Sequence, residues 1–277
     1  MSFHSRRRRG LRSPLVAGAA AALAAVTVAA APQAQAALTG VSTVAEAATP
    51  GRGLDPATGF PSWYADSTGT RLKLCVDSDF CLGGNSLPDP DAPASVATGN
   101  LPDEAFYAVA RAETELNVGG RIRWRAVLEG AFANDAVVPG DQITFTRVQV
   151  TGSKIKLAQN TKLRFVTPYG TFDASVGRDG KLSRERVESN PGDPTDKFAA
   201  PLSETQTGFG PTFLRWDPAV APAAPADHIG DPARLHRIVG GTNGNAFQVF
   251  NVTATGATGT AASPIVRTFE VAGQIAN

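Results

Sequence analysis

The stretch from Phe106 to Glu129, FYAVARAETELNVGGRIRWRAVLE, constrains the fold more than any other part of this chain. In both of its arms, apolar or small residues alternate with polar or charged residues, which is the period of a β-strand with one buried face. Between the arms lies Asn117-Val118-Gly119-Gly120, and a short loop at 118–120 that ends in a left-handed glycine commonly joins antiparallel strands. The stretch therefore predicts a β-hairpin.

The position of the loop sets the predicted cross-strand register. In that register apolar residues face apolar residues on one side, and acids face bases on the other. The expected pairs are Leu116 with Ile122, Thr114 with Trp124, Ala110 with Leu128, Glu115 with Arg123, and Glu113 with Arg125. Because a slip by one residue would turn the apolar side chains to solvent, the pattern indicates which face is buried. We expect the charged face to be a solvated sheet surface, with a polar ligand surface as the alternative.

Further short alternating segments, separated by glycine and proline, continue to the C-terminus, and no amphipathic helix is evident after the N-terminal region. This pattern predicts an all-β protein, an antiparallel β-sandwich of immunoglobulin-like or jelly-roll-like type with a small disulfide-stapled N-terminal segment. The expected organisation is a signal peptide at 1–36, a flexible lead-in at 37–53, a disulfide-stapled β-segment at 54–82, a proline-rich spacer at 83–103 and a β-sandwich domain at 104–277.

The N-terminal region has the order of a secretory signal peptide. An arginine-rich start at 6–12 precedes an uncharged apolar segment at 14–31 and then Ala34-Gln35-Ala36, so cleavage is expected near Ala36. The arginines fit either a Sec signal or a twin-arginine signal. Cleavage would reduce the 26 basic residues to 21 against 25 acidic residues, a net charge of −4. We therefore expect a secreted protein that binds no nucleic acid and has no membrane span after cleavage.

Cys75 and Cys81 are the only cysteines in the chain. In an exported protein such a pair predicts one local disulfide, because two cysteines are too few for a structural zinc site. Asp77 and Asp79 lie inside the cysteine loop, but two carboxylates are too few for a calcium site. We expect neither a metal ion nor a cofactor.

The sequence contains no recognisable catalytic constellation. No Gly-x-Ser-x-Gly elbow is present, and the spacing of His228 and His236 does not fit a zinc-binding helix. A carboxylate pair needs no fixed spacing, so a secreted carbohydrate-active hydrolase is the alternative function. The candidate acids are Glu113, Glu115, Glu129, Glu185 and Glu188. In the expected register the first two have arginine partners, which disfavours a general-acid role.

The function predicted from the sequence is therefore that of a secreted, non-enzymatic binding or cell-surface protein. Its expected partner is an extracellular or cell-wall ligand, either a glycan or a protein. The candidate ligand surface consists of Trp63, Tyr64, Asp77 and Asp79, whereas Trp124 is expected in the core. The long polar stretch at 183–210 is expected to be a surface excursion or the edge of a binding site.

The segment from Gly59 to Cys75 resembles a G-F-P-x-W-Y-x-D-x-x-G-x-x-L-x-L-C pattern found in a family of secreted bacterial β-rich proteins. Other stretches that resemble the body of these proteins are 138–148, 167–170, 210–216 and 229–232. The resemblance would cover nearly all of 54–277. It implies a secreted β-rich fold, and it carries over no catalytic residues.

Overall fold

The computed structural model describes residues 38–42, 53–188, 198–202 and 209–277. Within these ranges the chain forms three antiparallel sheets, and its only helical segments are short 3-10 turns at Arg178–Gly180 and Ala200–Leu202. The predicted antiparallel all-β sandwich is thus confirmed. The predicted signal peptide lies outside these ranges. No helix in the described part of the chain is long and apolar enough to cross a membrane.

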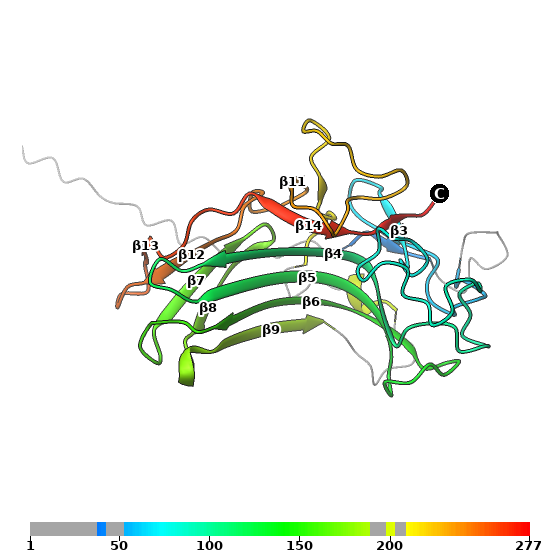
Figure 1. Cartoon of the computed structure of the whole chain (residues 1–277), viewed down its shortest axis with the longest axis horizontal. Coiled ribbons are helices and arrows are strands. Elements are labelled where there is room, and N and C mark those ends of the chain that lie inside the picture. The colour runs from blue at the N-terminus through cyan, green and yellow to red at the C-terminus, as the bar shows by residue number, and fades with distance from the viewer. Residues whose placement is uncertain (1–37, 43–52, 189–197, 203–208) are drawn as a thin grey trace, which may run out of the picture. The chain divides into compact units, whose positions relative to one another are not determined.

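The largest sheet has the strand order β10-β11-β14-β4-β5-β6-β9. Its strands are β10 (Arg215–Trp216), β11 (His236–Val239), β14 (Thr268–Ala272), β4 (Glu104–Glu115), β5 (Arg121–Phe132), β6 (Gln142–Ser153) and β9 (Leu182–Glu188). In Figure 1, β4, β5 and β6 are the long, curved green strands that lie side by side. They form the framework against which the other elements pack.

The second sheet has the order β13-β12-β7-β8. Its strands are β7 (Lys162–Thr167), β8 (Gly170–Ser175), β12 (Gln248–Val252) and β13 (Thr258–Ala261). The main core contains residues from both sheets, including Leu163 and Val249 from this one. Trp124 of β5 lies at its centre, with its ring centroid 6.4 Å from that of Phe247 and 5.9 Å from that of Phe269. The alternation in the hairpin therefore places Trp124 in the core, as predicted.

The hairpin of β4 and β5 has a different register from the one predicted. The observed pairs include Ala112 with Trp124, Thr114 with Ile122, Glu115 with Arg121, Glu113 with Arg123, and Arg111 with Arg125. The predicted pairs are wrong because the chain reverses at 117–119, one residue earlier than expected, and the Leu116 N–H donates to the Gly120 carbonyl at 2.9 Å. Since the register differs by an even number of residues, the side chains from Ala108 to Leu128 keep their predicted faces. A register irregularity between Phe106 and Ala108 reverses the two residues before it, so Tyr107 lies in the core and Phe106 packs on the other face, contrary to the prediction.

Tertiary contacts hold the loop in this position. Gly120 has a φ of +115°, and a Cβ built there would lie 2.6 Å from the Cα of Ile155. The neighbouring Gly119 carbonyl accepts a hydrogen bond from the Lys156 N–H at 3.2 Å. On the other side, the Asn117 N–H donates to the Ala262 carbonyl at 2.8 Å. The register thus depends on segments far from the hairpin in sequence.

The third sheet joins the N-terminal segment to the C-terminus. Its order is β1-β2-β3-β15, formed by β1 (Gly40–Val41), β2 (Tyr64–Ala65), β3 (Arg71–Lys73) and β15 (Gln274–Ile275). Leu72 pairs with Tyr64 on one side and with Ile275 on the other. The Tyr107 hydroxyl donates to the Pro61 carbonyl at 2.7 Å, which ties this segment to β4. Residues 54–82 therefore pack against the sandwich along their length.

Asp66 organises the turn that follows β2. Its carboxylate is buried and accepts hydrogen bonds from the backbone N–H groups of Thr68 at 2.9 Å and Thr70 at 3.0 Å. The other carboxylate oxygen accepts the N–H of Phe213 at 3.0 Å. These donors compensate for the burial of the charge. The aspartate of the G-F-P-x-W-Y-x-D segment thus has a structural role here, joining the N-terminal segment to the chain near Phe213.

The predicted disulfide between Cys75 and Cys81 is confirmed, with a Cα–Cα distance of 5.3 Å. The stretch at 83–103 contains no helix or strand. It is held by Asn100, whose side-chain amide donates to the carbonyl groups of Asp89 at 3.1 Å and Pro93 at 3.0 Å. The buried side-chain amide of Asn100 therefore connects parts of this irregular stretch to one another.

The polar stretch at 183–210 is not an excursion throughout. Its first residues belong to β9, which pairs with β6 from Thr146 to Gly152 and forms the edge of the largest sheet. Sequence polarity was misleading because an edge strand with one solvated face needs few apolar residues. Positions 189–197 and 203–208 of the stretch lie outside the described residues.

Candidate functional site

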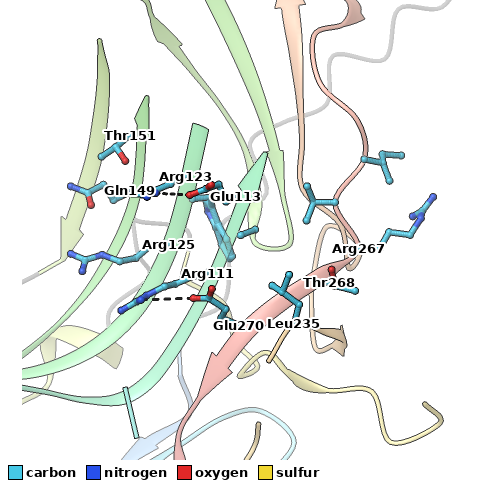
Figure 2. A pocket seen from close by; sticks show the side chains of 14 residues that line it. Arg111, Glu113, Arg123, Arg125, Gln149, Thr151, Leu235, Arg267, Thr268 and Glu270 are labelled. Carbon is cyan, nitrogen blue, oxygen red and sulfur yellow. Dashed lines mark hydrogen bonds and ion pairs between the residues drawn. The ribbon is translucent and has the colours of Figure 1, made fainter. Parts of the chain in front are cut away.

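A groove of about 940 Å³ lies on the charged face of the largest sheet (Figure 2). Outward-facing side chains of β4, β5 and β6 form its floor, and β14 with the residues before it, together with Leu235 just before β11, forms the opposite wall. The floor is formed by Arg111, Glu113, Arg123, Arg125, Gln149 and Thr151, and the wall by Leu235, Ile265, Val266, Arg267, Thr268 and Glu270. We call this feature the arginine groove.

The same alternation that fills the core produces the floor of the arginine groove. Ile122, Trp124 and Ala126 of β5 are buried on the inner face, so Arg123 and Arg125 between them project from the outer face. The wall comes from the distant C-terminal strand, because Glu270 of β14 pairs with Arg111 of β4. The arginine groove is therefore complete only when β14 is paired with β4.

The arginine groove has an excess of positive charge. Its lining has four arginines and two glutamates, a formal charge of +2. Glu113 is shared by Arg123 at 2.6 Å and Arg121 at 3.1 Å (Figure 2 shows the shorter contact). Glu270 lies 3.8 Å from Arg111, a distance too long for a hydrogen bond. The two carboxylates thus neutralise only part of the guanidinium charge.

Arg111 and Arg125 lie directly opposite each other across β4 and β5. The Leu116 to Gly120 hydrogen bond marks the even-numbered residues of β4 as the hydrogen-bonded pairs, so Arg111 and Arg125 form a non-hydrogen-bonded pair, in which side chains are closer. Burial, and then the charges of Arg125 and Arg123, lower the pKa of the Arg111 guanidinium. Like charges placed opposite each other in this way are unfavourable unless another group compensates them.

Arg125 has no ion-paired acid in the described part of the chain, although the buried Glu129 interacts with it electrostatically. Its Nε atom is buried and has no hydrogen-bond partner there, and no ion pair to its guanidinium is present among those residues. Arg267, which is exposed on the wall, likewise forms no ion pair within the described ranges. Two guanidinium groups are thus available to an anion that enters the arginine groove.

The wall of the arginine groove also carries exposed aliphatic side chains. Leu235 is 63% exposed and Ile265 is 45% exposed, and both are among the most exposed large apolar residues in the described ranges. An exposed aliphatic residue beside a polar groove provides a contact for an apolar part of a ligand. The arginine groove can therefore hold a ligand that has both anionic and apolar groups.

The residues predicted as a ligand surface are not all exposed. Tyr64 is 0% exposed, and its hydroxyl hydrogen-bonds to Thr144 and donates to the Phe198 carbonyl at 2.8 Å, so the prediction of an exposed Tyr64 is wrong. Because neighbouring side chains on a strand point to opposite faces, Tyr64 points into the core and Trp63 points outward, where it is half-buried. Arg71 covers the Trp63 ring, with its guanidinium carbon 4.3 Å from the ring centroid. Asp77 and Asp79 are exposed on the disulfide loop.

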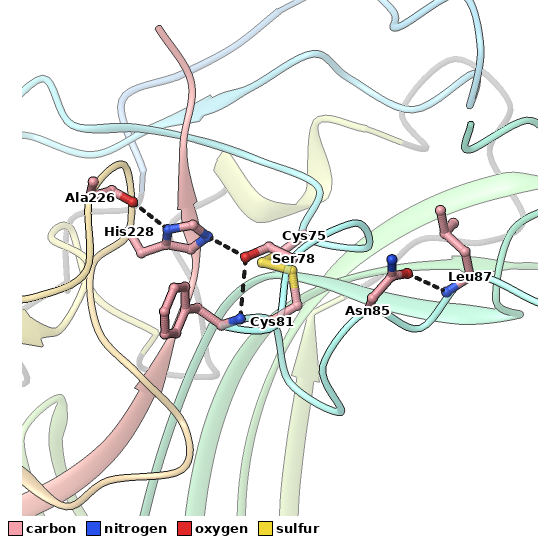
Figure 3. The surroundings of a disulfide bond; sticks show 8 residues. Cys75, Ser78, Cys81, Asn85, Leu87, Ala226 and His228 are labelled. Atoms are coloured by element: carbon pink, nitrogen blue, oxygen red, sulfur yellow. Dashed lines mark hydrogen bonds between the residues drawn. A yellow bond between two sulfur atoms is a disulfide. The ribbon is translucent and has the colours of Figure 1, made fainter. Parts of the chain in front are cut away.

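The disulfide loop forms a contact that could not be recognised in the sequence (Figure 3). Ser78 Oγ lies 2.9 Å from His228 Nε2, and His228 Nδ1 lies 2.6 Å from the Ala226 carbonyl oxygen. A serine and a histidine oriented in this way have the relationship of a nucleophile and its base. However, Ser78 Oγ also accepts the Phe80 N–H at 3.2 Å, and the Phe80 ring packs against His228. We interpret the contact as a clasp between the loop and residues 226–229.

Glu129 is the candidate acid with the most unusual environment. It is 1% exposed, and its Oε1 atom lies 3.4 Å from the guanidinium of Arg147. Its Oε2 atom is buried and has no hydrogen-bond partner in the described ranges. Burial, and then the neighbouring Glu104, raise the pKa of Glu129 to about 9. The side chain does not line the arginine groove.

Among the described side chains, the remaining candidate acids do not form a pair across the arginine groove. Glu113 is held by two arginines, as described above, and Glu115 is exposed opposite Arg121. The side chains of Glu185 and Glu188 lie outside the described part of the structure. Within that part, no group of three or more His, Cys, Asp and Glu residues is placed to hold a metal ion.

Comparisons with known proteins do not identify the chain. No family model, no curated protein and no solved structure matches it. Its function must therefore be argued from the chemistry of the arginine groove.

Proposed function

We propose that this chain is an exported, non-enzymatic binding protein and that its ligand occupies the arginine groove. The observation that carries the proposal is the Arg111–Arg125 pair, in which two guanidinium groups face each other and one of them has no acidic partner among the described residues. A purely solvated sheet face gains from pairing bases with acids. Opposed arginines are instead stabilised when an anionic ligand binds between them by charge-assisted hydrogen bonds.

The expected site of action, outside the cell or on its surface, rests on two features of the chain. The first is the signal-peptide pattern at 1–36, which would direct export. The second is the disulfide between Cys75 and Cys81, which is stable in oxidising compartments. The family of secreted β-rich proteins that the segment from Gly59 to Cys75 resembles is consistent with the same location.

The alternative, a secreted hydrolase with a carboxylate pair, has less support. Glycosidases hold their two carboxyl groups about 5–10 Å apart across the substrate. Among the described residues, Glu129 is the acid whose pKa a neighbouring carboxyl, Glu104, helps to raise, but Glu129 is buried and does not line the arginine groove. Glu113, in the arginine groove, is neutralised by arginines. Neither arrangement leaves a protonated carboxyl facing an open groove.

The proposal can be tested by sedimentation. Purified protein would be incubated with cell walls, insoluble polysaccharides and immobilised culture-supernatant proteins, and the loss of protein from solution would be measured. We expect depletion by one of these materials, and we expect Arg125→Gln to reduce it. Arg178→Gln is the matched control, because Arg178 is an exposed arginine outside the arginine groove. Equal depletion of both variants, or no depletion of the unmodified protein, would contradict the proposal.

A further inference from the structure

The edge of β4 is open beside the arginine groove. β14 pairs with β4 only from Val109 to Arg111. The next backbone contact on this side is at Asn117, whose N–H donates to the Ala262 carbonyl. Between these two points the C-terminal chain leaves β4, because Val266 pairs with Phe247 beside the second sheet. Among the residues that the structure describes, a short length of β4 is thus left without a neighbouring strand.

Glu113 and Glu115 direct their backbone groups towards this open edge. In an antiparallel strand the N–H and C=O groups of successive residues point to opposite sides. Leu116 donates its N–H towards β5, so Glu113 and Glu115 point away from β5. Neither residue has a backbone hydrogen bond on that side within the described ranges. Unpaired groups along a strand edge are the usual template for adding another extended chain.

The side chains around the open edge define the chemistry of such a chain. Arg125 and Arg267 offer guanidinium groups to carboxylates, and Leu235 and Ile265 offer aliphatic contacts. Exposed aromatic rings, on which sugars commonly stack, are missing from the described lining, since Trp124 is fully buried. Aliphatic contacts combined with a free backbone edge fit a polypeptide better than a glycan.

We propose that the ligand is an extended, acidic polypeptide segment of a partner protein, which adds as a strand to β4 at Glu113–Glu115. Its backbone would exchange hydrogen bonds with these two residues, its carboxylates would contact Arg125 and Arg267, and its apolar side chains would contact Leu235 and Ile265. This inference rests on the proposed function, since it names the class of ligand for the same arginine groove.

Fluorescence anisotropy with synthetic peptides tests the inference. The probe is a labelled peptide in which glutamate and valine alternate, and its controls are a glutamine–valine peptide and the same glutamate–valine peptide with alternate backbone nitrogens methylated. We expect the first probe to bind and both control peptides to bind about tenfold more weakly or worse, because charge-assisted and backbone hydrogen bonds are lost. The double variant Arg125→Gln, Arg267→Gln should show a similar loss, and Arg178→Gln should bind normally.

Other results would overturn the inference. Equal binding of the methylated peptide would show that no strand is added at the edge of β4. Binding of soluble polygalacturonate that depends on Arg125, together with no binding of the peptide, would identify the ligand as a glycan and leave the proposed function standing. Failure of the peptide, of polygalacturonate and of every material in the sedimentation test would overturn the proposed function as well. Unchanged thermal unfolding of each variant would exclude misfolding as the cause.

Discussion

The two faces of the β4–β5 hairpin are made by the same strands and have opposite properties. Ile122 and Trp124 on the inner face are fully buried between the sheets. Arg123 and Arg125, which follow them in sequence, lie on the outer face and line the arginine groove. The inner face depends only on alternation, because any apolar neighbour supports burial. The outer face depends on register, because the identity of the opposite residue decides whether a charge is neutralised.

The outer face is itself divided along the strands. Towards the disulfide loop, Val109, Val127 and Ala272 form a small apolar cluster with Leu82 and Phe106 packed against it. Glu129 is buried two residues beyond Val127 on the same face. Towards the hairpin loop the face is charged and open. The comparison of inner and outer faces can therefore be tested at three kinds of position. These are buried apolar positions (closed apolar), buried ionisable positions (closed ionisable) and exposed charged positions (open charged).

The largest effect is expected at the closed inner face. Trp124→Ala should lower the free energy of unfolding by about 3–5 kcal/mol, because it removes the ring that contacts Phe247 and Phe269. Chemical denaturation would measure the change. A loss below about 0.5 kcal/mol, the range of most surface substitutions, would mean that the ring is not the centre of the core.

Glu129→Gln tests the closed ionisable position through pH. The pKa of Glu129 is raised to about 9 in the folded protein, whereas a glutamate in an unfolded chain has a pKa of about 4.3. Between these values the folded protein holds a proton that the unfolded chain releases, so the free energy of unfolding contributed by Glu129 falls as pH rises. Glutamine mimics the protonated form. Relative to the unmodified protein, the variant should gain up to about 1.4 kcal/mol per pH unit within this window.

Denaturation at several pH values would check this prediction, with Glu115→Gln as the control, because Glu115 is an exposed acid on the same hairpin. A stability difference that stays constant from acidic to alkaline pH would show that Glu129 is ionised in the folded protein. In that case the Arg147 contact, and not burial beside Glu104, would dominate its environment.

Arg125→Gln tests the open charged face. The substitution removes the repulsion between opposed guanidinium groups, so the free energy of unfolding should stay the same or rise by up to about 1 kcal/mol. Ligand binding should fall in the same variant. Thermal unfolding and the peptide assay would be compared. A clear loss of stability would indicate that Arg125 has a structural role, and the case for a ligand site would fail.

The smallest effect is expected for Glu113→Gln. Its carboxylate contacts Arg121 and Arg123 on the exposed face, and exposed ion pairs of this kind contribute little to folding. We expect an unfolding midpoint within error of that of the unmodified protein at high salt, where such pairs are screened. A large shift that persists in high salt would contradict the division between closed and open positions.

Much of the fold could be predicted from local sequence, and the candidate site could not. Alternation identified the hairpin and its buried face, and two cysteines in an exported chain indicated the disulfide. The candidate surface that included Tyr64 was wrong in part because neighbouring aromatics on a strand face opposite sides, and only packing shows which one is inside. The Ser78–His228 contact joins residues far apart in the chain, so no local signal predicted it.

The arginine groove was missed for a more specific reason. In the predicted register Glu113 faced Arg125, which neutralised the group that the structure leaves without an acidic partner among the described residues. Gly119 and Gly120 both have positive φ values. Because either glycine can take the left-handed position of the turn, the local sequence allows a loop at 118–120 or one at 117–119. The choice was made by the packing of Gly120 against Ile155 and by the bond from Asn117 to Ala262.

The sequence by itself determined the face on which each side chain from Ala108 to Leu128 lies, because alternation assigns faces and a register change by an even number of residues leaves them unchanged. Only the tertiary structure decided which charges meet and where an edge stays open. Those features depend on β14, which brings Glu270 to Arg111, and on the divergence of the chain before it, which leaves Glu113 and Glu115 unpaired along their outer edge in the described structure. Both features result from contacts between segments that are distant in the chain, and the local periodicity of the hairpin contains no information about those contacts.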